Sequence, residues 1–202
     1  MTSSPQTKLI LASGSAIRAA LLRNAGVMFD VQKIAIDEDD VKASFMSEGA
    51  TAVDIARALA EMKALRAKCD GGQYIIGADQ VLICEDQLFS KADNPEQLRD
   101  QLCDLCDKQH QLISAVCVAQ NKQILWHHVA TADLTMRSFS DSFLDAYLAA
   151  HEDDILQSVG GYQLEGPGIQ LFRDIKGDYF TILGLPLLPL LDFLRLHGCV
   201  ES

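Results

Sequence analysis

Short apolar segments alternate with longer amphipathic segments along this chain, and that alternation most constrains its fold. The short segments are rich in β-branched residues, as buried strands are, and the longer ones repeat apolar residues at helical spacing. Strand-like segments occupy residues 8–12, 29–34, 112–119 and 124–136, and helix-like segments occupy residues 16–24, 50–68 and 187–196. The order predicts an α/β fold with a mixed, twisted sheet flanked by helices. No linker or repeat interrupts the chain, so we expect one domain over residues 1–202, built as two lobes.

Composition excludes several classes of function. Of the 202 residues, 49% are hydrophobic and 22% are charged, which is typical of a globular protein, and the formal net charge is −11. An acidic chain repels nucleic acids and anionic membranes, so we expect neither as a partner. The apolar segment 182–196 is interrupted by prolines and charges, and residues 1–8 have no apolar signal core, so a cytoplasmic location is expected.

The six cysteines are expected to be free thiols in a reducing compartment. Cys103 and Cys106 have the spacing of half a zinc site or of a redox motif. They also fall on a predicted helix, and no second such pair follows. Ordinary helix positions and a metal or redox role both remain open for them.

A small-residue loop, Ser13-Gly14-Ser15, lies between the first predicted strand and the first predicted helix. Exposed N–H groups at a helix start attract anions, Gly14 permits close approach of a ligand, and the two serines add hydroxyl donors. Arg18 in the first helical turn opposes the helix dipole unless an anion is bound. The alternative is an ordinary capped helix with Arg18 in solvent.

Asp79 lies between two apolar segments, in the sequence YIIGADQVLIC. A carboxylate in such surroundings is partly desolvated and requires a partner or a cation, as catalytic bases and magnesium ligands do. A turn aspartate at the end of a strand is the alternative. Lys63 and Lys91, taken alone, are ordinary surface lysines, and the acidic segment 37–40 is a predicted loop whose carboxylates are also candidate metal ligands.

The order and spacing of these motifs resemble the Maf family of nucleoside triphosphate pyrophosphatases. The similarity extends over about residues 9–196, nearly the whole chain. The matching segments are Ser13 to Arg18 (S-x-S-x-R in the family), Ile36-Asp37-Glu38, Leu59 to Ala64 (L-A-x-x-K-A), Gly77-Ala78-Asp79-Gln80, Lys91, Gly161 to Gly166, and Gly177 to Pro186.

The resemblance implies an enzyme that hydrolyses the anhydride between the α and β phosphates of a nucleoside triphosphate. It further implies a divalent cation, Mg²⁺ or Mn²⁺, a cleft between the two lobes, and a homodimer. Asp79 matches the family's catalytic proton acceptor, and Glu38 matches a second carboxylate of the same site, so both are candidate metal ligands. The candidate phosphate-binding residues are Ser13, Gly14, Ser15, Arg18, Lys63 and Lys91.

Three positions bear on the base of the nucleotide. Gln80 and Glu165 resemble the branch of the family that hydrolyses 7-methyl-GTP, and Glu165 can accept hydrogen bonds from the N–H donors of a guanine edge. Ile17 stands where the family has a basic or aromatic residue. That loss motivates an alternative function, a non-catalytic nucleotide-binding regulator of cell division on the same fold.

Overall fold

The computed structural model describes residues 9–69 and 71–201, and it divides into two compact units. The first unit comprises residues up to 80, residues 114–130 and residues from 184 onward, and the second comprises residues 81–113 and 131–183. Residues 1–8, including Lys8 of the first predicted strand, lie outside the described residues. The single domain and the cleft between lobes stay predictions.

The described strands form one seven-stranded mixed sheet, which confirms the predicted fold class. The strand order is β2-β1-β3-β5-β6-β7, with β4 paired to β3. Strand β1 pairs in parallel with β2 and β3, whereas β4 and β7 run antiparallel to their neighbours β3 and β6. The strands are β1 (Leu9–Ala12), β2 (Asp30–Val31), β3 (Tyr74–Cys84), β4 (Gln87–Phe89), β5 (Gln109–Gln120), β6 (Gln123–Met136) and β7 (Phe172–Lys176).

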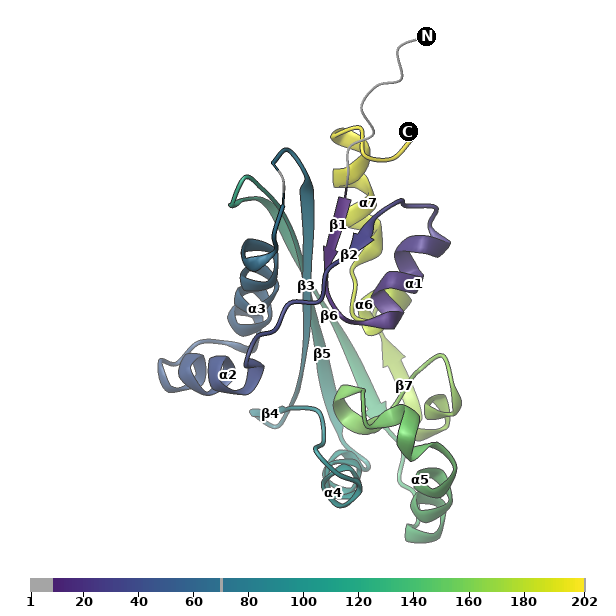
Figure 1. The fold of residues 1–202 in the computed structure, drawn as a ribbon. Coiled ribbons are helices and arrows are strands. Elements are labelled where there is room, and N and C mark those ends of the chain that lie inside the picture. Colours follow the sequence, from purple (N-terminus) through teal and green to yellow (C-terminus); the bar gives the residue numbers. More distant parts are fainter. Residues whose placement is uncertain (1–8, 70, 202) are drawn as a thin grey trace. The chain divides into compact units, whose positions relative to one another are not determined.

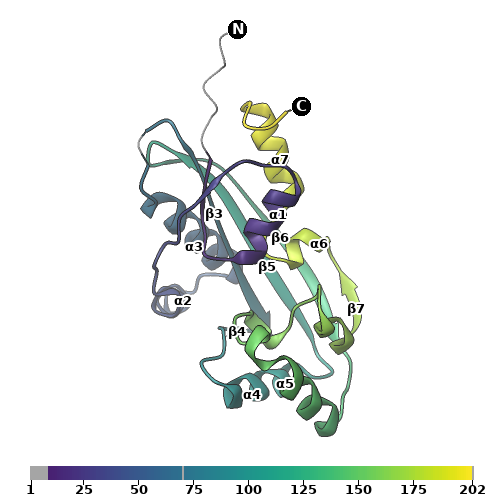
Figure 2. The ribbon, with the colours of Figure 1, turned by 45° about the vertical axis from the view of Figure 1, so that its right-hand side comes forward.

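In the first unit, helix α3 lies on one face of the strands, and α1 and α7 lie on the other face (Figures 1 and 2). Buried leucine and isoleucine side chains on these helices and strands form its core. Capping residues place the helix starts, as Ser15 does for α1 and Thr51 with Asp54 does for α3. The helices of this unit are α1 (Ala16–Asn24), α2 (Glu38–Ser47), α3 (Ala52–Arg66) and α7 (Leu187–Leu196).

The second unit has its own hydrophobic core, in which α4 packs beside α5 and the short helix η1. Asn94 caps α4, and Pro95 lies at its start, where the missing N–H of proline costs no helical hydrogen bond. Among the described residues, no helix is both long and apolar enough to span a membrane. The helices of this unit are α4 (Pro95–Leu105), α5 (Asp141–Ile155), η1 (Val159–Gly161), η2 (Pro167–Leu171) and α6 (Tyr179–Ile182).

Three local predictions were wrong. The acidic segment 37–40 is the start of α2, because Asp37 is its N-cap and acidic residues in the first turn are stabilised by the helix dipole. Asp79 is not a turn residue at the end of a strand, since β3 runs through it. The apolar segments 169–172 and 179–183 predict a hairpin that turns near residues 176–178, but the structure has β7 followed by α6, which Asp178 caps.

Candidate active site

The loop after β1 lies beside the middle of β3 because the two strands are parallel and Ala12 pairs with Gly77. This register brings Ser13 next to Ala78 and Asp79. The Ser13 hydroxyl accepts a hydrogen bond from the backbone N–H of Ser15 at 3.3 Å. The Ser15 hydroxyl in turn caps α1 by accepting the N–H of Arg18 at 3.3 Å. The small-residue loop is therefore held by its own hydroxyls at the start of α1.

Gly77 allows α3 to approach β3 more closely than any side chain would permit. A Cβ atom at this position would lie 2.2 Å from the carbonyl oxygen of Ala60 and 2.8 Å from the Cβ of Ala64. Lys63 lies on the helix between these two residues. Because alternate strand residues share a face, Asp79 points to the same side of β3 as Gly77, toward α3. The close approach thus places Lys63 over Asp79.

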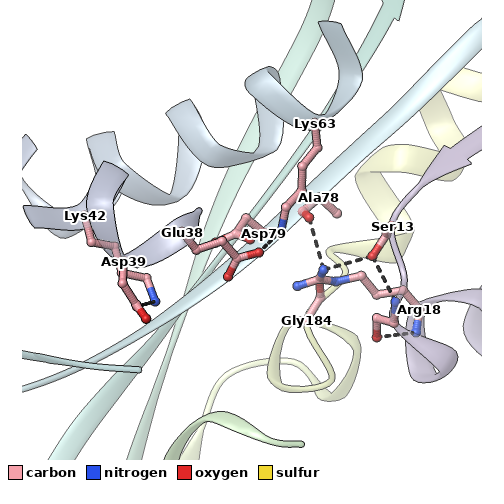
Figure 3. A network of polar contacts seen from close by, with 10 residues as sticks. Ser13, Arg18, Glu38, Asp39, Lys42, Lys63, Ala78, Asp79 and Gly184 are labelled. Atoms are coloured by element: carbon pink, nitrogen blue, oxygen red, sulfur yellow. Dashed lines mark hydrogen bonds and ion pairs between the residues drawn. The ribbon is translucent and has the colours of Figure 1, made fainter. Parts of the chain in front are cut away.

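Lys63 lies between two carboxylates. Its Nζ donates to Oδ1 of Asp79 at 2.5 Å and to Oε1 of Glu38 at 2.6 Å. Figure 3 shows Glu38 from α2 and Lys63 from α3 both directed at Asp79 on β3. The side chains of Asp79 and Lys63 are 3% and 9% exposed, whereas that of Glu38 is 39% exposed. Glu38 therefore joins a buried ion pair to the surface.

Arg18 is buried on the other side of Asp79, and its guanidinium is fixed by three acceptors. Nε donates to the carbonyl of Gly184 at 2.7 Å, and Nη1 donates to Ser13 Oγ at 3.2 Å and to the carbonyl of Ala78 at 3.0 Å (Figure 3). Burial lowers the pKa of Arg18, and the negative charges of Asp79 and Glu38 oppose that shift. The predicted alternative of a solvent-facing Arg18 is thus wrong.

Asp79 itself is the most buried ionisable residue of this cluster, with 2% of the whole residue exposed. Burial raises the pKa of its carboxyl above the ordinary value, against the opposing charges of Lys63 and Arg18. Its Oδ1 is bound to Lys63, whereas its buried Oδ2 has no hydrogen-bond partner within the described structure. Such an orphaned oxygen is free to accept a proton or to bind a cation.

The donor set fits a divalent cation that is shared with a phosphate. Asp79 and Glu38 offer carboxylate oxygens, and Oδ2 of Asp79 is without a partner in the part of the chain described. No group of three or more histidine, cysteine or acidic side chains suited to a metal occurs among the described residues. Two carboxylates suffice for Mg²⁺ when substrate phosphates complete its coordination. Cys103 and Cys106 therefore belong to no such group within the described part of the chain.

Gln80 points to the opposite face of β3 from Asp79, and its amide nitrogen donates to the hydroxyl of Ser114 on β5 at 2.9 Å. Gly184, whose φ is +88°, lies beside the side chains of Arg18 and Gln80. A Cβ there would come within 3.3 Å of Arg18 and 3.5 Å of Gln80 Oε1. The sequence identified neither Ser114 nor Gly184 as a site residue, although Gly184 lies in the segment Gly177 to Pro186 that resembles the family.

Two predicted site residues belong to the second unit. Lys91 is exposed in the segment between β4 and α4, and Glu165 is exposed in the loop between η1 and η2. Ile17, which belongs to the first unit, is half-buried in the first turn of α1. The structure therefore brings together Ser13, Arg18, Glu38, Lys63 and Asp79, whereas the participation of Lys91 and Glu165 in the same site stays a prediction.

The chain is similar to known proteins over nearly its whole length. Residues 8–197 match the family described as Maf-like protein. A nucleoside triphosphate pyrophosphatase from Granulibacter bethesdensis is 50% identical over 191 residues, which cover 94% of this chain and 97% of that protein. A 7-methyl-GTP pyrophosphatase from Brucella abortus is 48% identical over 196 residues, covering 96% and 98%. A 7-methyl-GTP pyrophosphatase from Rhizobium meliloti is 44% identical over 195 residues, with the same coverage.

Proposed function

The chain belongs to the Maf family, and from that premise we propose that it is a nucleoside triphosphate pyrophosphatase. It adds water across the anhydride between the α and β phosphates and releases a nucleoside monophosphate and pyrophosphate. The observation that carries the proposal is the buried cluster in which Asp79 retains one unpartnered oxygen beside Lys63 and Arg18. Relatives named for this activity support it.

Asp79 is the general base in this proposal. Its raised pKa moves the carboxylate toward the pH range in which bases work, and the unpartnered Oδ2 would accept the proton of the attacking water. Lys63 holds Oδ1 and keeps the other oxygen in place. Arg18 and the loop Ser13-Gly14-Ser15 at the start of α1 then bind phosphate oxygens, whose negative charge increases on the leaving pyrophosphate.

Mg²⁺ or Mn²⁺ would be held by Glu38 and Asp79 together with the substrate. Within the cluster, the charges of Arg18 and Lys63 are balanced by those of Asp79 and Glu38, so a triphosphate brings excess negative charge. A divalent cation there neutralises phosphate oxygens and lowers the pKa of a bound water. Lys91 is a further phosphate ligand in this proposal.

The preferred substrate in our proposal is a 7-methyl-GTP-like nucleotide. Relatives at 48% and 44% identity carry that name, and in this proposal Gln80 and Glu165 select the base. Glu165 is exposed and accepts the N–H donors of a guanine edge in this scheme. We further propose a cytoplasmic homodimer without nucleic-acid partners, in keeping with the net charge of −11.

The test is pyrophosphate release from canonical and modified triphosphates, with Mg²⁺ or Mn²⁺ and with Asp79→Asn as the variant. The amide would keep the shape of the side chain but could not take up a proton, so we expect turnover to fall by about a thousandfold or more. Undiminished activity of the variant would remove Asp79 as the base. Tight nucleotide binding without turnover in the wild-type protein would favour the regulator instead.

A further inference from the structure

Lys33 lies across the loop that begins α1. If Gly14 carried a Cβ atom, that atom would be 3.2 Å from Cγ, 3.3 Å from Cδ and 3.4 Å from Cε of Lys33. Three successive carbons of the lysine stem therefore follow the backbone of Gly14, and the ammonium group lies one bond beyond the last of them. An aliphatic stem on a flat glycine surface with its charged end in solvent is a common arrangement for lysine.

The sheet accounts for this placement. Strand β2 pairs in parallel with β1, and the N–H of Gln32 donates to the carbonyl of Leu11 at 2.9 Å, which extends the pairing beyond β2. Parallel strands end at the same edge of a sheet. Lys33 therefore leaves its strand beside the point where Ser13 and Gly14 leave theirs, at the start of α1.

Lys33 differs from the two buried cations of the cluster in how its charge is used. Lys63 has two carboxylates within 2.6 Å, and Arg18 has three hydrogen-bonded acceptors. Lys33 is exposed, and no hydrogen bond or ion pair to its side chain occurs within the described residues. Of these three cations, Lys33 is thus the one whose charge no described protein group neutralises.

We propose that the ammonium group of Lys33 binds the triphosphate of the substrate at the loop Ser13-Gly14-Ser15. The assignment rests on the proposed function for the nature of the ligand. It explains how the chain tolerates an apolar Ile17 in the first turn of α1, since Lys33 supplies a cation to the same helix start from the neighbouring strand. It also gives Gly14 a second role, because any side chain there would displace the lysine stem.

The experiment compares Lys33→Met, which keeps the stem and removes the charge, with Lys33→Arg, which keeps the charge. The control is Lys68→Met, another exposed lysine of the same unit whose backbone N–H bonds to Gln32. For Lys33→Met we expect about a fivefold rise in KM with little change in kcat. This effect is larger than the loss of an exposed ion pair and smaller than the loss of a buried charge-assisted hydrogen bond. Lys33→Arg should restore most of the affinity, and Lys68→Met should leave KM unchanged.

Calorimetric titration with inorganic tripolyphosphate in the presence of Mg²⁺ gives a readout that does not depend on catalysis. Lys33→Met should weaken this binding by the same factor as it raises KM, and should make it less sensitive to salt. An unchanged affinity in Lys33→Met, or an equal loss in Lys68→Met, would overturn the assignment. A wild-type protein that binds tripolyphosphate but hydrolyses no nucleotide would contradict the proposed function and leave Lys33 to be judged by binding alone.

Discussion

Two buried polar clusters, one in each unit, differ in the charge of their members. In the first unit, Asp79, Lys63 and Arg18 are ionisable groups: Lys63 donates a hydrogen bond to Asp79, and Arg18 acts on the same carboxylate through its charge. In the second unit, His110 and Tyr162 form a neutral pair with 2.8 Å between Nε2 and the hydroxyl. Each cluster has one buried atom without a partner in the described structure, Oδ2 of Asp79 and Nδ1 of His110.

The difference in charge distinguishes a candidate reactive site from a pair that stabilises the core. Burying ions costs free energy even when they are paired, so the buried ionised cluster is the candidate reactive site. Around His110, burial lowers the pKa to about 4 and raises that of Tyr162, so both groups stay neutral at pH 7. A neutral pair packed against Phe172 serves the core of the second unit. Three changes test this distinction.

Of these three changes, Lys63→Met is expected to have the largest effect. It leaves Asp79 and Glu38 facing each other without their shared cation, so we expect a loss of about 3 kcal/mol in the free energy of unfolding. Turnover should fall by about a hundredfold or more, because the group that orients the base is gone. Since Lys63 lowers the pKa of Asp79, the acid limb of the kcat/KM profile should move to higher pH in any residual activity.

The control for this variant is Arg57→Met on the same helix, which breaks the 3.3 Å pair with Asp54 between two side chains that are 44% and 42% exposed. That change should cost less than about 1 kcal/mol and should leave the pH profile in place. If both variants lost activity equally, the buried cluster would have no special role.

The second-largest effect of the three is expected from Gly77→Ala. The added Cβ would lie 2.2 Å from a backbone carbonyl of α3, which a side-chain rotation cannot relieve, so the helix must move away from β3. We expect a loss of about 3 kcal/mol in stability, together with at least a tenfold drop in turnover as Lys63 moves from Asp79. Thermal unfolding and pyrophosphate release measure the two effects.

Gly166→Ala is the matched glycine control for stability, because its nearest non-neighbouring atom lies 3.8 Å from the added Cβ. An unfolding temperature close to wild type is expected for it. Equal destabilisation by the two alanines would mean that the closeness of α3 and β3 does not decide the stability of the site.

Gly77 also shows how far the sequence predicts the site. The motif around Asp79 and the strand-loop-helix at Ser13 are local patterns, so the sequence identified their residues and the α/β fold. The sequence did not predict that residues 77–80 continue a strand, because a glycine and an aspartate there have low strand propensity. Burial against α3 overrides that propensity. Contacts between distant segments, such as Arg18 with the carbonyl of Gly184, leave no local pattern to read.

The smallest effect is expected from the neutral pair and depends on pH. His110 is 1% exposed, and its pKa falls from 6.5 to about 4 on folding. The unfolded chain therefore binds a proton below pH 6.5 that the folded chain does not bind until about pH 4. The contribution of neutral His110 to the free energy of unfolding is fully present above pH 6.5 and is lost as the pH falls toward 4. The loss between pH 7 and pH 5 is about 2 kcal/mol.

His110→Phe removes the group that titrates. As the pH falls from 7 to 5, the wild type should therefore lose about 2 kcal/mol more of its free energy of unfolding than the variant does. Tyr162→Phe removes the hydrogen-bond partner but leaves His110 buried. It should lower stability by about 1 kcal/mol at both pH values and keep the wild-type slope, since burial causes the shift. Denaturant titrations at the two pH values measure both. A slope that disappears in Tyr162→Phe as well would mean that the hydroxyl, and not burial, keeps His110 neutral. The contrast would then lie in the hydrogen-bond partners of the two clusters.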